Sequence, residues 1–411
     1  MRSPTYFAFQ RSGRAVAATA VAIALVAGSV VAFAFPAAAA SPSWKVVPSP
    51  SPASLFPFLN DVSCATATNC FAVGQAEDNA GNIENTLVEQ WNGKVWAIVP
   101  SPNPTVLPFS VLAGVSCSST TSCFAVGSHT DGRHDVDTLV EHWNGKVWAI
   151  VPSPNATGLT FSLLLKVWCA SATSCVAVGF NDNASRTAST TLVEQWNGKV
   201  WSIVASPNPT ARPDSLLYSV SCSSATNCFA VGWSQSLLDP DTVKYTLIEH
   251  WNGKAWAIVA SPNRSTAPNN NLYGVACVST TNCFAIGASL SLDETADSTL
   301  VEHWNGKGWS IVASPNAPAL PNSTLDDMSC VSATSCVAVG YDSDATNTKG
   351  ETLVEHWNGK TWSIQPSPNA TALPDSYFEA VTCASATSCV AVGYDSDAAG
   401  TTGKTLVERF G

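Results

Sequence analysis

The feature that most constrains this chain is a cysteine pair, spaced C-x(5)-C, that occurs seven times along it. Successive first cysteines lie 53, 52, 53, 55, 53 and 53 residues apart, so the chain is a repeat with a nearly constant period. A period of this length is typical of solenoids and propellers. The pairs are Cys64 with Cys70, Cys117 with Cys123, Cys169 with Cys175, Cys222 with Cys228, Cys277 with Cys283, Cys330 with Cys336, and Cys383 with Cys389.

Each repeat contains four short runs that are rich in Val, Ile, Phe and Trp and bounded by turn residues, as β-strands are. In the first repeat we expect strands a, b, c and d over Leu59–Cys64, Phe71–Gly74, Thr86–Trp91 and Val95–Val99. Helical periodicity of useful length is absent. Four strands per repeat is the composition of a propeller blade, so the sequence predicts an all-β fold.

The two ends of the chain predict how many blades there are and how they close. The C-terminal "TLVERFG" is a strand c without a strand d, and "SWKVVPSPS" is a strand d without a repeat before it. Trp44–Val47 would therefore complete the last blade. The sequence predicts a seven-bladed β-propeller over residues 41–411, with four antiparallel strands per blade and a ring whose closure hides its sheet edges.

The first forty residues have the order of parts of a secretory signal peptide. Arg2, Arg11 and Arg14 precede an apolar run from Ala15 to Phe35, and small residues follow as far as Ala40. We expect residues 1–40 to be cleaved off and the protein to be secreted and extracellular, without a membrane association. The alternative is an uncleaved anchor, because about 20 apolar residues can span a bilayer.

The charge of the mature chain argues against nucleic acid as a partner. Removing residues 1–40 takes away three arginines and no acid, which moves the net charge from −11 to −14. A chain this acidic has no basic stripe to meet phosphates. We expect a monomer that has no cofactor and whose partner is an extracellular glycan or protein.

The cysteine pairs are predicted to be disulfides. Each pair ends strand a and begins strand b, so its members would face each other across a five-residue hairpin loop. Export together with a complete set of local pairs favours disulfides, each worth about 2 kcal/mol from loop closure. Zinc would need four ligands, hence two blades for each ion. We therefore expect no metal site.

The stretch "TLVEQWNGKVW" is interpreted as structural. Asn92 and Gly93 predict a two-residue hairpin that pairs Glu89 with Trp96. Glu89 would then lie between aromatic side chains and near Lys94, which would allow a partly covered ion pair. A catalytic acid needs one special environment, but this glutamate recurs as Glu141, Glu194, Glu249, Glu302, Glu355 and Glu408. The next position holds His142, His250, His303 and His356, or Gln or Arg, which favours a hydrogen-bonding position over a metal ligand.

The repeat also resembles known proteins. Over the whole mature chain, the "TLVEHWNG…W…PSPN" units resemble uncharacterised bacterial secreted repeat proteins, and this resemblance implies a propeller and secretion but no activity. The turn at "GKVW" is similar to the Asp-box of sialidase-type propellers. Gly93 and Trp96 match that motif, whereas Trp91 stands in the position of its Asp.

Length variation distinguishes the two rims of the predicted propeller. Between the Gly that ends strand b and the Thr that begins strand c lie 11, 10, 11, 13, 11, 11 and 11 residues, which accounts for every deviation in the repeat period. The a–b and c–d turns would share a uniform rim. The b–c and d–a connections would share the other rim, with long divergent loops, where function usually resides on a rigid scaffold.

Two groups of residues on this variable rim are candidates for ligand binding. The first consists of aromatic side chains that could stack on sugar rings, although they could equally pack beneath their own loops: Phe180, Trp233, Tyr341 and Tyr394, with Trp168, Tyr218 and Tyr273 on strand a. Trp168 would plug the axis or fill a gap between blades. The second consists of acids that could gather a cation, act as an acid/base pair or carry only solvated charge: Asp61, Asp326, Asp327 and Glu379.

Three functional hypotheses follow from these observations. We expect a secreted, non-enzymatic propeller that binds a polysaccharide or protein through its variable rim, because no nucleophile–base motif is present. The first alternative is a glycoside hydrolase or lyase of the sialidase-like propeller type, with acids from different blades. The second is a structural surface protein.

Overall fold

The computed structural model describes residues 42–52, 55–78, 84–104, 109–130, 135–156, 158–183, 185, 187–236, 243–265, 267–291, 297–317, 320–345, 349–369 and 373–411. The expected signal peptide lies outside these residues. The described residues form β-strands and turns, without an α-helix. Over the same ranges, therefore, no helix is long and apolar enough to cross a bilayer.

The strands fall into four classes, which correspond to the predicted strands a to d. Strands a are β2 (Leu55–Thr66), β6 (Ser110–Ser119), β10 (Phe161–Ser171), β14 (Asp214–Ser224), β18 (Asn269–Ser279), β22 (Asn322–Ser332) and β26 (Asp375–Ser385). Strands b are β3 (Asn69–Asp78), β7 (Ser122–Thr130), β11 (Ser174–Asp182), β15 (Asn227–Gln235), β19 (Asn282–Leu290), β23 (Ser335–Ser343) and β27 (Ser388–Ser396).

Strands c are β4 (Glu84–Trp91), β8 (Val136–Trp143), β12 (Ser189–Trp196), β16 (Lys244–Trp251), β20 (Asp297–Trp304), β24 (Gly350–Trp357) and β28 (Gly403–Phe410). Strands d are shorter: β5 (Trp96–Ile98), β9 (Trp148–Ile150), β13 (Trp201–Ile203), β17 (Trp256–Val259), β21 (Trp309–Val312), β25 (Trp362–Ile364) and β1 (Trp44–Val46).

Consecutive strands pair in antiparallel fashion. Five sheets have four strands each, and a sixth has eight because a single parallel pair, Phe161 with Val136, joins two groups of four. The strand nearest the N-terminus, β1, pairs with β28, with Trp44 opposite Phe410. Trp44 is buried there and its ring lies 5.6 Å from that of Phe410. The two ends of the described chain thus share one sheet.

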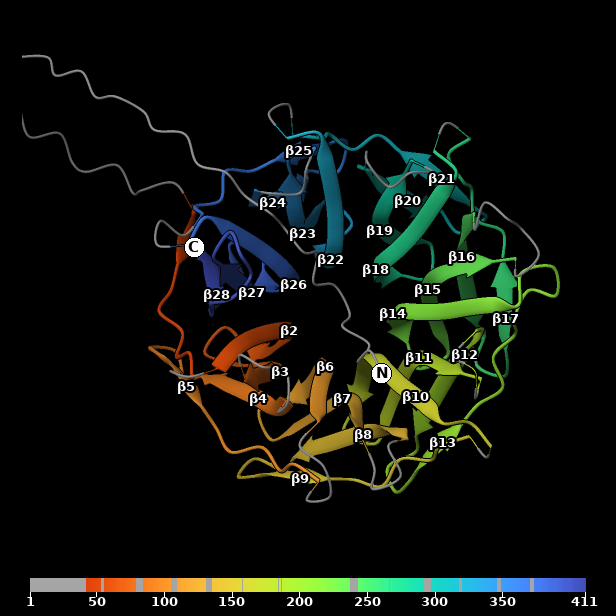
Figure 1. Cartoon of the computed structure of the whole chain (residues 1–411). Coiled ribbons are helices and arrows are strands. Elements are labelled where there is room, and N and C mark those ends of the chain that lie inside the picture. The colour runs from red at the N-terminus through yellow and green to blue at the C-terminus, as the bar shows by residue number, and fades with distance from the viewer. Residues whose placement is uncertain are drawn as a thin grey trace, which may run out of the picture.

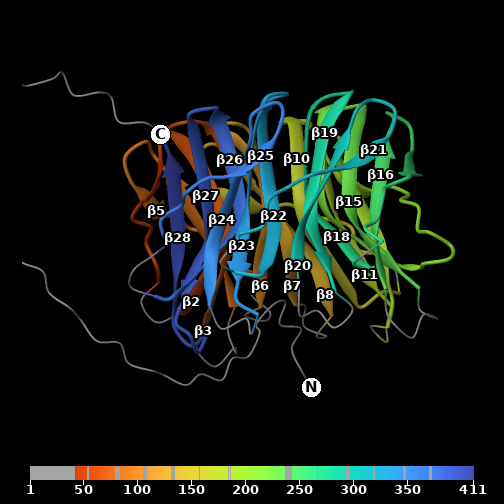
Figure 2. The same cartoon turned by 90° about the horizontal axis from the view of Figure 1, so that it is seen from above.

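The sheets stand around a central axis with strand a of each repeat innermost (Figure 1). Seen at right angles, the strands run side by side through the thickness of the molecule (Figure 2). Neighbouring strands a pack against each other, and β2 contacts both β6 and β26. This all-β arrangement of repeated four-stranded sheets is that of a β-propeller.

The core lies between neighbouring sheets. One cluster joins Phe71 and Val73 of the first repeat to Leu112, Trp143 and Trp148 of the second. The ring of Phe71 lies 5.0 Å from that of Trp143 and 5.2 Å from that of Trp148. Each sheet packs both of its faces against neighbouring sheets. Apolar side chains on either face of a strand are therefore buried, which explains why the strands are short apolar runs.

The predicted disulfides are present in every repeat, and the two members of each are directly opposite each other in the register of strands a and b. The bonds join Cys64 to Cys70, Cys117 to Cys123, Cys169 to Cys175, Cys222 to Cys228, Cys277 to Cys283, Cys330 to Cys336, and Cys383 to Cys389.

From the sequence, the disulfides were expected to lie at the edge of an open five-residue loop. They do not. In the first repeat the strands continue past Cys64 and Cys70 to the pair Thr66 and Asn69, beyond a one-residue register shift. Only Ala67 and Thr68 make the turn. The same register shift follows the first cysteine in every other repeat. The cysteines are therefore paired strand residues.

This position also buries one cysteine of each pair. The second cysteine belongs to strand b, which lies inside its sheet, and it is part of the apolar core in every repeat: Cys70, Cys123, Cys175, Cys228, Cys283, Cys336 and Cys389. The first cysteine is partly exposed, except that Cys222 is buried as well. Because the neighbouring sheets cover these sulfurs, the disulfides are part of the packing between sheets and do not form a surface site.

The expected two-residue hairpin at "WNGK" is wrong. Trp91 pairs with Trp96, so the loop between them has four residues. Asn92 Oδ1 accepts hydrogen bonds from the N–H groups of Lys94 (2.9 Å) and Val95 (3.0 Å), and Gly93 has a φ of 90°. The side chain of Asn92 thus stabilises a wider turn, and the cross-strand partner of Glu89 is Ile98 rather than Trp96.

The expectation of long b–c loops also needs correction. In the last repeat β27 ends at Ser396 and β28 begins at Gly403, so five of the eleven residues between Gly393 and Thr405 are paired strand and only six form the connection. Tyr394 is opposite Thr405 in that ladder. The residues that follow strand b's glycine therefore sit on rigid sheet and not on loops.

Candidate functional site

The recurring glutamates hold adjacent sheets together. Glu141 is fully buried, and both of its carboxylate oxygens accept a hydrogen bond at 2.9 Å from Ser101 of the preceding "SPN" segment. Ser101 also bonds Thr86 of its own sheet (2.8 Å). Equivalent serine–glutamate bonds occur at Glu89, Glu194, Glu249, Glu302, Glu355 and Glu408. The structural interpretation of these glutamates is confirmed.

The ion pair expected between Glu89 and Lys94 is absent from the described structure, because Glu89 is buried against Ser49 at 2.7 Å. Burial raises the pKa of every one of these glutamates: to about 7 for Glu89 and Glu194, and to about 8 for Glu141, Glu249, Glu302, Glu355 and Glu408. A protonated carboxyl is buried at a lower cost than an ionised one, which is why burial moves these pKa values upward.

Three of the histidines that follow the glutamates, His142, His250 and His303, make side-chain hydrogen bonds, as expected for a strand position. His250 Nε2 lies 2.8 Å from Asn227 Oδ1, and its ring stacks on Phe229. Partial burial lowers the pKa of His142, His250, His303 and His356.

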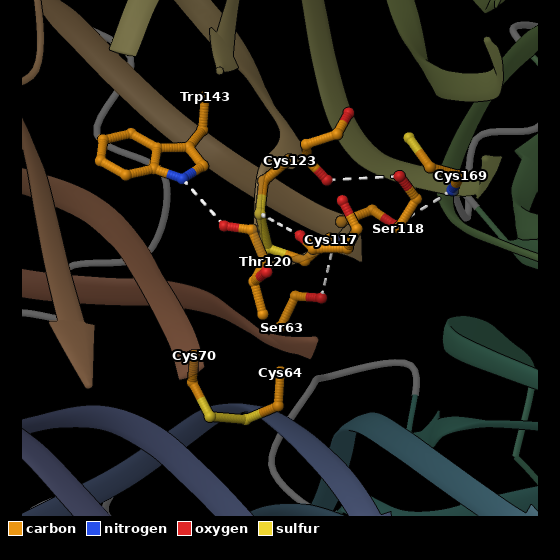
Figure 3. The surroundings of a disulfide bond; sticks show 12 residues. Ser63, Cys64, Cys70, Cys117, Ser118, Thr120, Cys123, Trp143 and Cys169 are labelled. Atoms are coloured by element: carbon orange, nitrogen blue, oxygen red, sulfur yellow. Dashed lines mark hydrogen bonds between the residues drawn. A yellow bond between two sulfur atoms is a disulfide. The ribbon is translucent and has the colours of Figure 1, made fainter. Parts of the chain in front are cut away.

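A second set of inter-sheet bonds lies beside the disulfides (Figure 3). The N–H of Cys117 donates to Ser63 Oγ of the preceding sheet at 3.0 Å, and that of Cys169 donates to Ser116 Oγ at 3.0 Å. Trp168 replaces this serine in the third repeat. It packs against an apolar cluster between the third and fourth repeats, which includes Val220. Trp168 therefore fills a gap between sheets, which is one of the two positions expected for it.

Three charged side chains meet near the axis and form what we call the ion triad. Lys166 Nζ lies 2.8 Å from Asp61 Oδ1 and 3.1 Å from Asp327 Oδ2. These residues come from β10, β2 and β22, each three positions before the first cysteine of its repeat. Asp61 Oδ2 also accepts the N–H of Val115 (2.8 Å), and Asp327 Oδ2 that of Val381 (3.2 Å). The triad thus ties inner strands to one another across the axis.

This finding corrects the interpretation of Asp61 and Asp327 as a candidate cation site or solvated rim charge. Asp61 is 1% exposed and Asp327 6%, and their oxygens are occupied by Lys166 and backbone N–H groups. Burial raises the pKa of Asp61 to about 6, although Lys166 acts against this. Burial lowers the pKa of Lys166, but the two carboxylates outweigh it and raise that pKa overall. Sequence reasoning missed Lys166, whose signal is a lone charge in the apolar run "LLLKVW".

One position closer to the variable rim, every strand a carries a β-bulge. The bulged residues include Asp326 and Glu379, which we call the acid pair, and Tyr218 and Tyr273. The rings of the two tyrosines contact edge to face at 5.1 Å. All four side chains are partly exposed. A bulge redirects its extra side chain, and here it brings side chains of neighbouring sheets together.

The acid pair contributes to the pKa values of three tyrosines. Burial, then Glu379, then Asp327 raise the pKa of Asp326 well above its usual range. Burial raises the pKa of Glu379 to about 7. The pKa values of Tyr273, Tyr341 and Tyr394 are raised first by burial, with Asp326 among the further causes for each. These candidates come from strands a and b of three consecutive repeats, whose strands a contact one another.

Beyond the acid pair a continuous row of aromatic rings runs from β23 to β2. We call Phe56, Phe58, Tyr341, Tyr377 and Tyr394 the aromatic band. Centroid distances are 4.7 Å from Phe56 to Phe58, 4.8 Å from Phe58 to Tyr394, 5.1 Å from Tyr394 to Tyr377 and 5.1 Å from Tyr377 to Tyr341. All five side chains are partly exposed. Sequence reasoning missed Phe56, Phe58 and Tyr377, because strand a was expected to begin only at Leu59.

Two glycines make room for this band. A Cβ at Gly350, where β24 begins, would lie 2.5 Å from the Tyr377 ring of the next repeat, and a Cβ at Gly403, where β28 begins, would lie 2.6 Å from the ring of Phe56. The other strands c begin with Glu84, Val136, Ser189, Lys244 and Asp297. The band therefore departs from the repeat in two ways: it has additional aromatic side chains, and glycines replace the larger residues that would collide with them.

The remaining aromatic candidates lie elsewhere. Phe180 is 1% exposed and stacks on Phe161 at 5.8 Å, so it is a core residue and not a platform. For Phe180, the alternative given in the sequence analysis therefore applies: the ring packs beneath its own segment and does not stack on a ligand. Trp233 packs with Tyr218 against the same cluster, and Lys244 Nζ lies 5.2 Å from the centre of its ring.

Within the described ranges, no group of three or more His, Cys, Asp and Glu side chains is arranged to hold a metal ion. The acid pair is the remaining pair of candidate carboxyls, and it lies among tyrosines. Its chemistry is that of hydrogen bonding to hydroxyls, of attraction for an organic cation, or of acid/base exchange between two coupled groups.

No protein-family model and no curated protein matches this chain in sequence. Solved structures do resemble it. The polysaccharide lyase Uly1 has a TM-score of 0.55 at 9% identity, over 86% of this chain and 90% of that one. The WD40 β-propeller domain of Doa1 has 0.54 at 10%, over 90% and 97%, and YCF48 bound to D1 peptide has 0.52 at 12%, over 91% and 98%. At such identities the likeness shows the fold alone, which is a β-propeller.

Proposed function

We propose that this protein is a secreted, seven-bladed β-propeller that binds an extracellular polysaccharide through the aromatic band and the acid pair. The observation that carries the proposal is the unbroken row of five partly exposed rings beside two carboxyls. The apolar C–H faces of sugar rings pack on aromatic rings, while hydroxyls donate to carboxylates. One structural neighbour, Uly1, is a polysaccharide lyase, which agrees with such a ligand.

The seven-bladed ring is part of this proposal. The eight-stranded sheet counts as two blades, since one parallel pair joins its halves, and β1 supplies the outermost strand of the last blade. The contact of β2 with β26 supports closure. A chain that lacks residues 41–52 should have a lower melting temperature and should self-associate, because β28 would expose its edge. An unchanged melting temperature would contradict the closure.

Secretion is supported by the order of parts in residues 1–40 and by the disulfides, which persist in oxidising compartments. N-terminal sequencing of the protein recovered from culture medium should begin at Ser41. Recovery only with the cell membrane fraction would favour the retained anchor.

Binding is tested with the purified protein on immobilised polysaccharides and by calorimetry on those that bind. Tyr394→Ala should weaken binding at least about tenfold, because it removes the ring that contacts Phe58 and Tyr377. Tyr245→Ala is the matched control, since Tyr245 lies in β16 near the same rim but outside the band. Equal losses in both variants, or no binding of any polysaccharide by folded protein, would refute the proposal.

A glycoside hydrolase or lyase is the second candidate function, because Asp326 and Glu379 occupy the same bulge position on the neighbouring strands β22 and β26 and both have raised pKa values. Such a pair can divide the roles of acid and base. Release of new sugar ends from a bound polysaccharide, lost in Glu379→Gln, would establish it. Binding without any product would leave the non-enzymatic function in place.

A further inference from the structure

The acid pair differs from the ion triad in that no cation accompanies it. Among the described residues, salt bridges join Lys166 to Asp61 and to Asp327, and Lys349 to Glu351. Both of these ion pairs of Lys166 are therefore with the carboxylates of the triad. No Lys, Arg or His within the described ranges forms a salt bridge with Asp326 or Glu379.

Two carboxyls in this position are costly without a positive partner. Burial and mutual repulsion disfavour their charged forms, and this is the direction in which both pKa values move. A positive group that enters from the variable rim would remove the repulsion. The site is therefore complementary in charge to a cation.

The surrounding side chains specify an organic cation. Tyr341 is opposite Thr324, two residues before Asp326, and Tyr394 is opposite Tyr377, two residues before Glu379. Tyr273 occupies the same bulge position on β18 that Asp326 occupies on the neighbouring β22. Aromatic rings attract ammonium groups through their negative faces, and phenols are weak ligands for hard metal ions, which prefer carboxylates and water. Rings and carboxylates together suit an amine that is carried on a larger molecule.

The aromatic band extends this site across three consecutive repeats, from Tyr341 through Tyr377 and Tyr394 to Phe58 and Phe56. Gly350 and Gly403 leave the space that the rings of Tyr377 and Phe56 occupy in this row. A ligand that engages both the acid pair and this row must itself be extended.

From this geometry we infer that the polysaccharide carries free amino groups, as a polymer of hexosamine units does: one ammonium binds Asp326 and Glu379, and neighbouring sugar rings lie along the aromatic band. This inference rests on the proposed function and adds the chemical class of the ligand.

The test compares two ligands of equal length, an oligomer of glucosamine and an oligomer of N-acetylglucosamine, by calorimetry at pH 7 and low salt. Acetylation removes the charge and keeps the sugar ring, so the first ligand should bind at least about tenfold more tightly. In the double variant that combines Asp326→Asn with Glu379→Gln, this preference should fall to about onefold. Glu351→Gln, which removes an exposed acid near the same rim, should retain it.

The outcomes separate this inference from the proposed function. Equal binding of both oligomers, weakened by Tyr394→Ala, would overturn the amine specificity and leave polysaccharide binding in place. Binding of neither oligomer, together with binding of a lysine-rich peptide, would overturn both in favour of a protein partner. A double variant that keeps the wild-type preference would also overturn the inference. Melting temperatures and near-ultraviolet circular dichroism of each variant establish that it is folded.

Discussion

At the scale of single residues, the ion triad shows how one side chain acts on several sheets. Lys166 comes from β10 and contacts carboxylates of β2 and β22, while both carboxylates also accept N–H groups of the following sheet. Each donor is needed, because a buried carboxylate without a partner costs several kcal/mol. Asp327 of the triad is the residue next to Asp326 and raises the pKa of that acid, after burial and Glu379.

Replacing Lys166 by Met should therefore lower the free energy of unfolding by about 3–5 kcal/mol at pH 8, because it leaves two buried carboxylates unpaired. The loss should shrink at pH 5, since unpaired carboxyls are then protonated more readily. Urea denaturation at the two pH values measures the difference. A loss that grows on acidification would contradict the assignment of the triad.

The buried glutamates give a second prediction at this scale. Burial raises the pKa of Glu302 to about 8, so the neutral form predominates in the folded protein at pH 7. Glu302→Gln should be at least as stable as the wild type at pH 8, because the amide is neutral and can still bond Ser261. Glu302→Ala should lose about 2–4 kcal/mol through a cavity and the loss of the hydrogen bonds from Ser261. Thermal unfolding that ranks the Gln variant below the Ala variant would refute this.

At the scale of elements, strand a has two irregularities in every repeat. One register shift lies just after the first cysteine, and the other is the bulge four residues before it. The first shortens the a–b turn to two residues beneath the disulfide. The second redirects the bulged side chain and so places Asp326, Glu379 and Tyr273 in one cluster. The same bulge therefore has only a structural role in some repeats, whereas in others its side chain is part of the candidate site.

Each disulfide should stabilise its own hairpin independently of the others. Replacing both Cys277 and Cys283 by Ala should lower the free energy of unfolding by about 2 kcal/mol, from the loss of one closed ring of seven residues. Removing Cys64 and Cys70 in addition should cost about 2 kcal/mol more, because distant sites are nearly additive. Guanidinium denaturation of both variants provides the measurement. No change in either would mean that the ring closure contributes nothing.

At the scale of the whole molecule, the repeated glutamates act together. In the window from pH 6.5 to pH 8 the unfolded chain has ionised all seven, whereas the folded protein retains protons on them, since burial raises their pKa values to about 7 or about 8. The folded state thus binds more protons, and the free energy of unfolding must fall as pH rises.

We therefore expect the melting temperature to decrease steadily from pH 6.5 to pH 8, with each proton held only by the folded state contributing about 1.4 kcal/mol per pH unit. Below pH 6.5 the histidines oppose the trend, because their pKa values are lowered in the folded state. The double variant that combines Glu302→Gln with Glu355→Gln should show a shallower slope. Stability that rises with pH across this window would contradict the burial of these carboxyls.

The sequence by itself determined the features that recur in every repeat. The cysteine pairs, the four strands of each repeat and the structural role of Glu89 and its equivalents could be predicted, because the same residue types at the same spacing recur and only one local structure satisfies them all. The N-terminal segment at Trp44 could likewise be paired with the unpaired strand at Phe410, since each completes what the other lacks.

The tertiary structure alone decided what breaks the symmetry. Lys166 could not be matched with Asp61 and Asp327 from the sequence, because its partners lie 105 and 161 residues away. Nor could the spacing show that Phe180 is buried while Tyr394 is partly exposed. Both follow strand b's glycine, and their surroundings are set by neighbouring sheets. Contacts across the axis and between sheets depend on how all the repeats pack, so only the complete fold brings the acid pair and the aromatic band together.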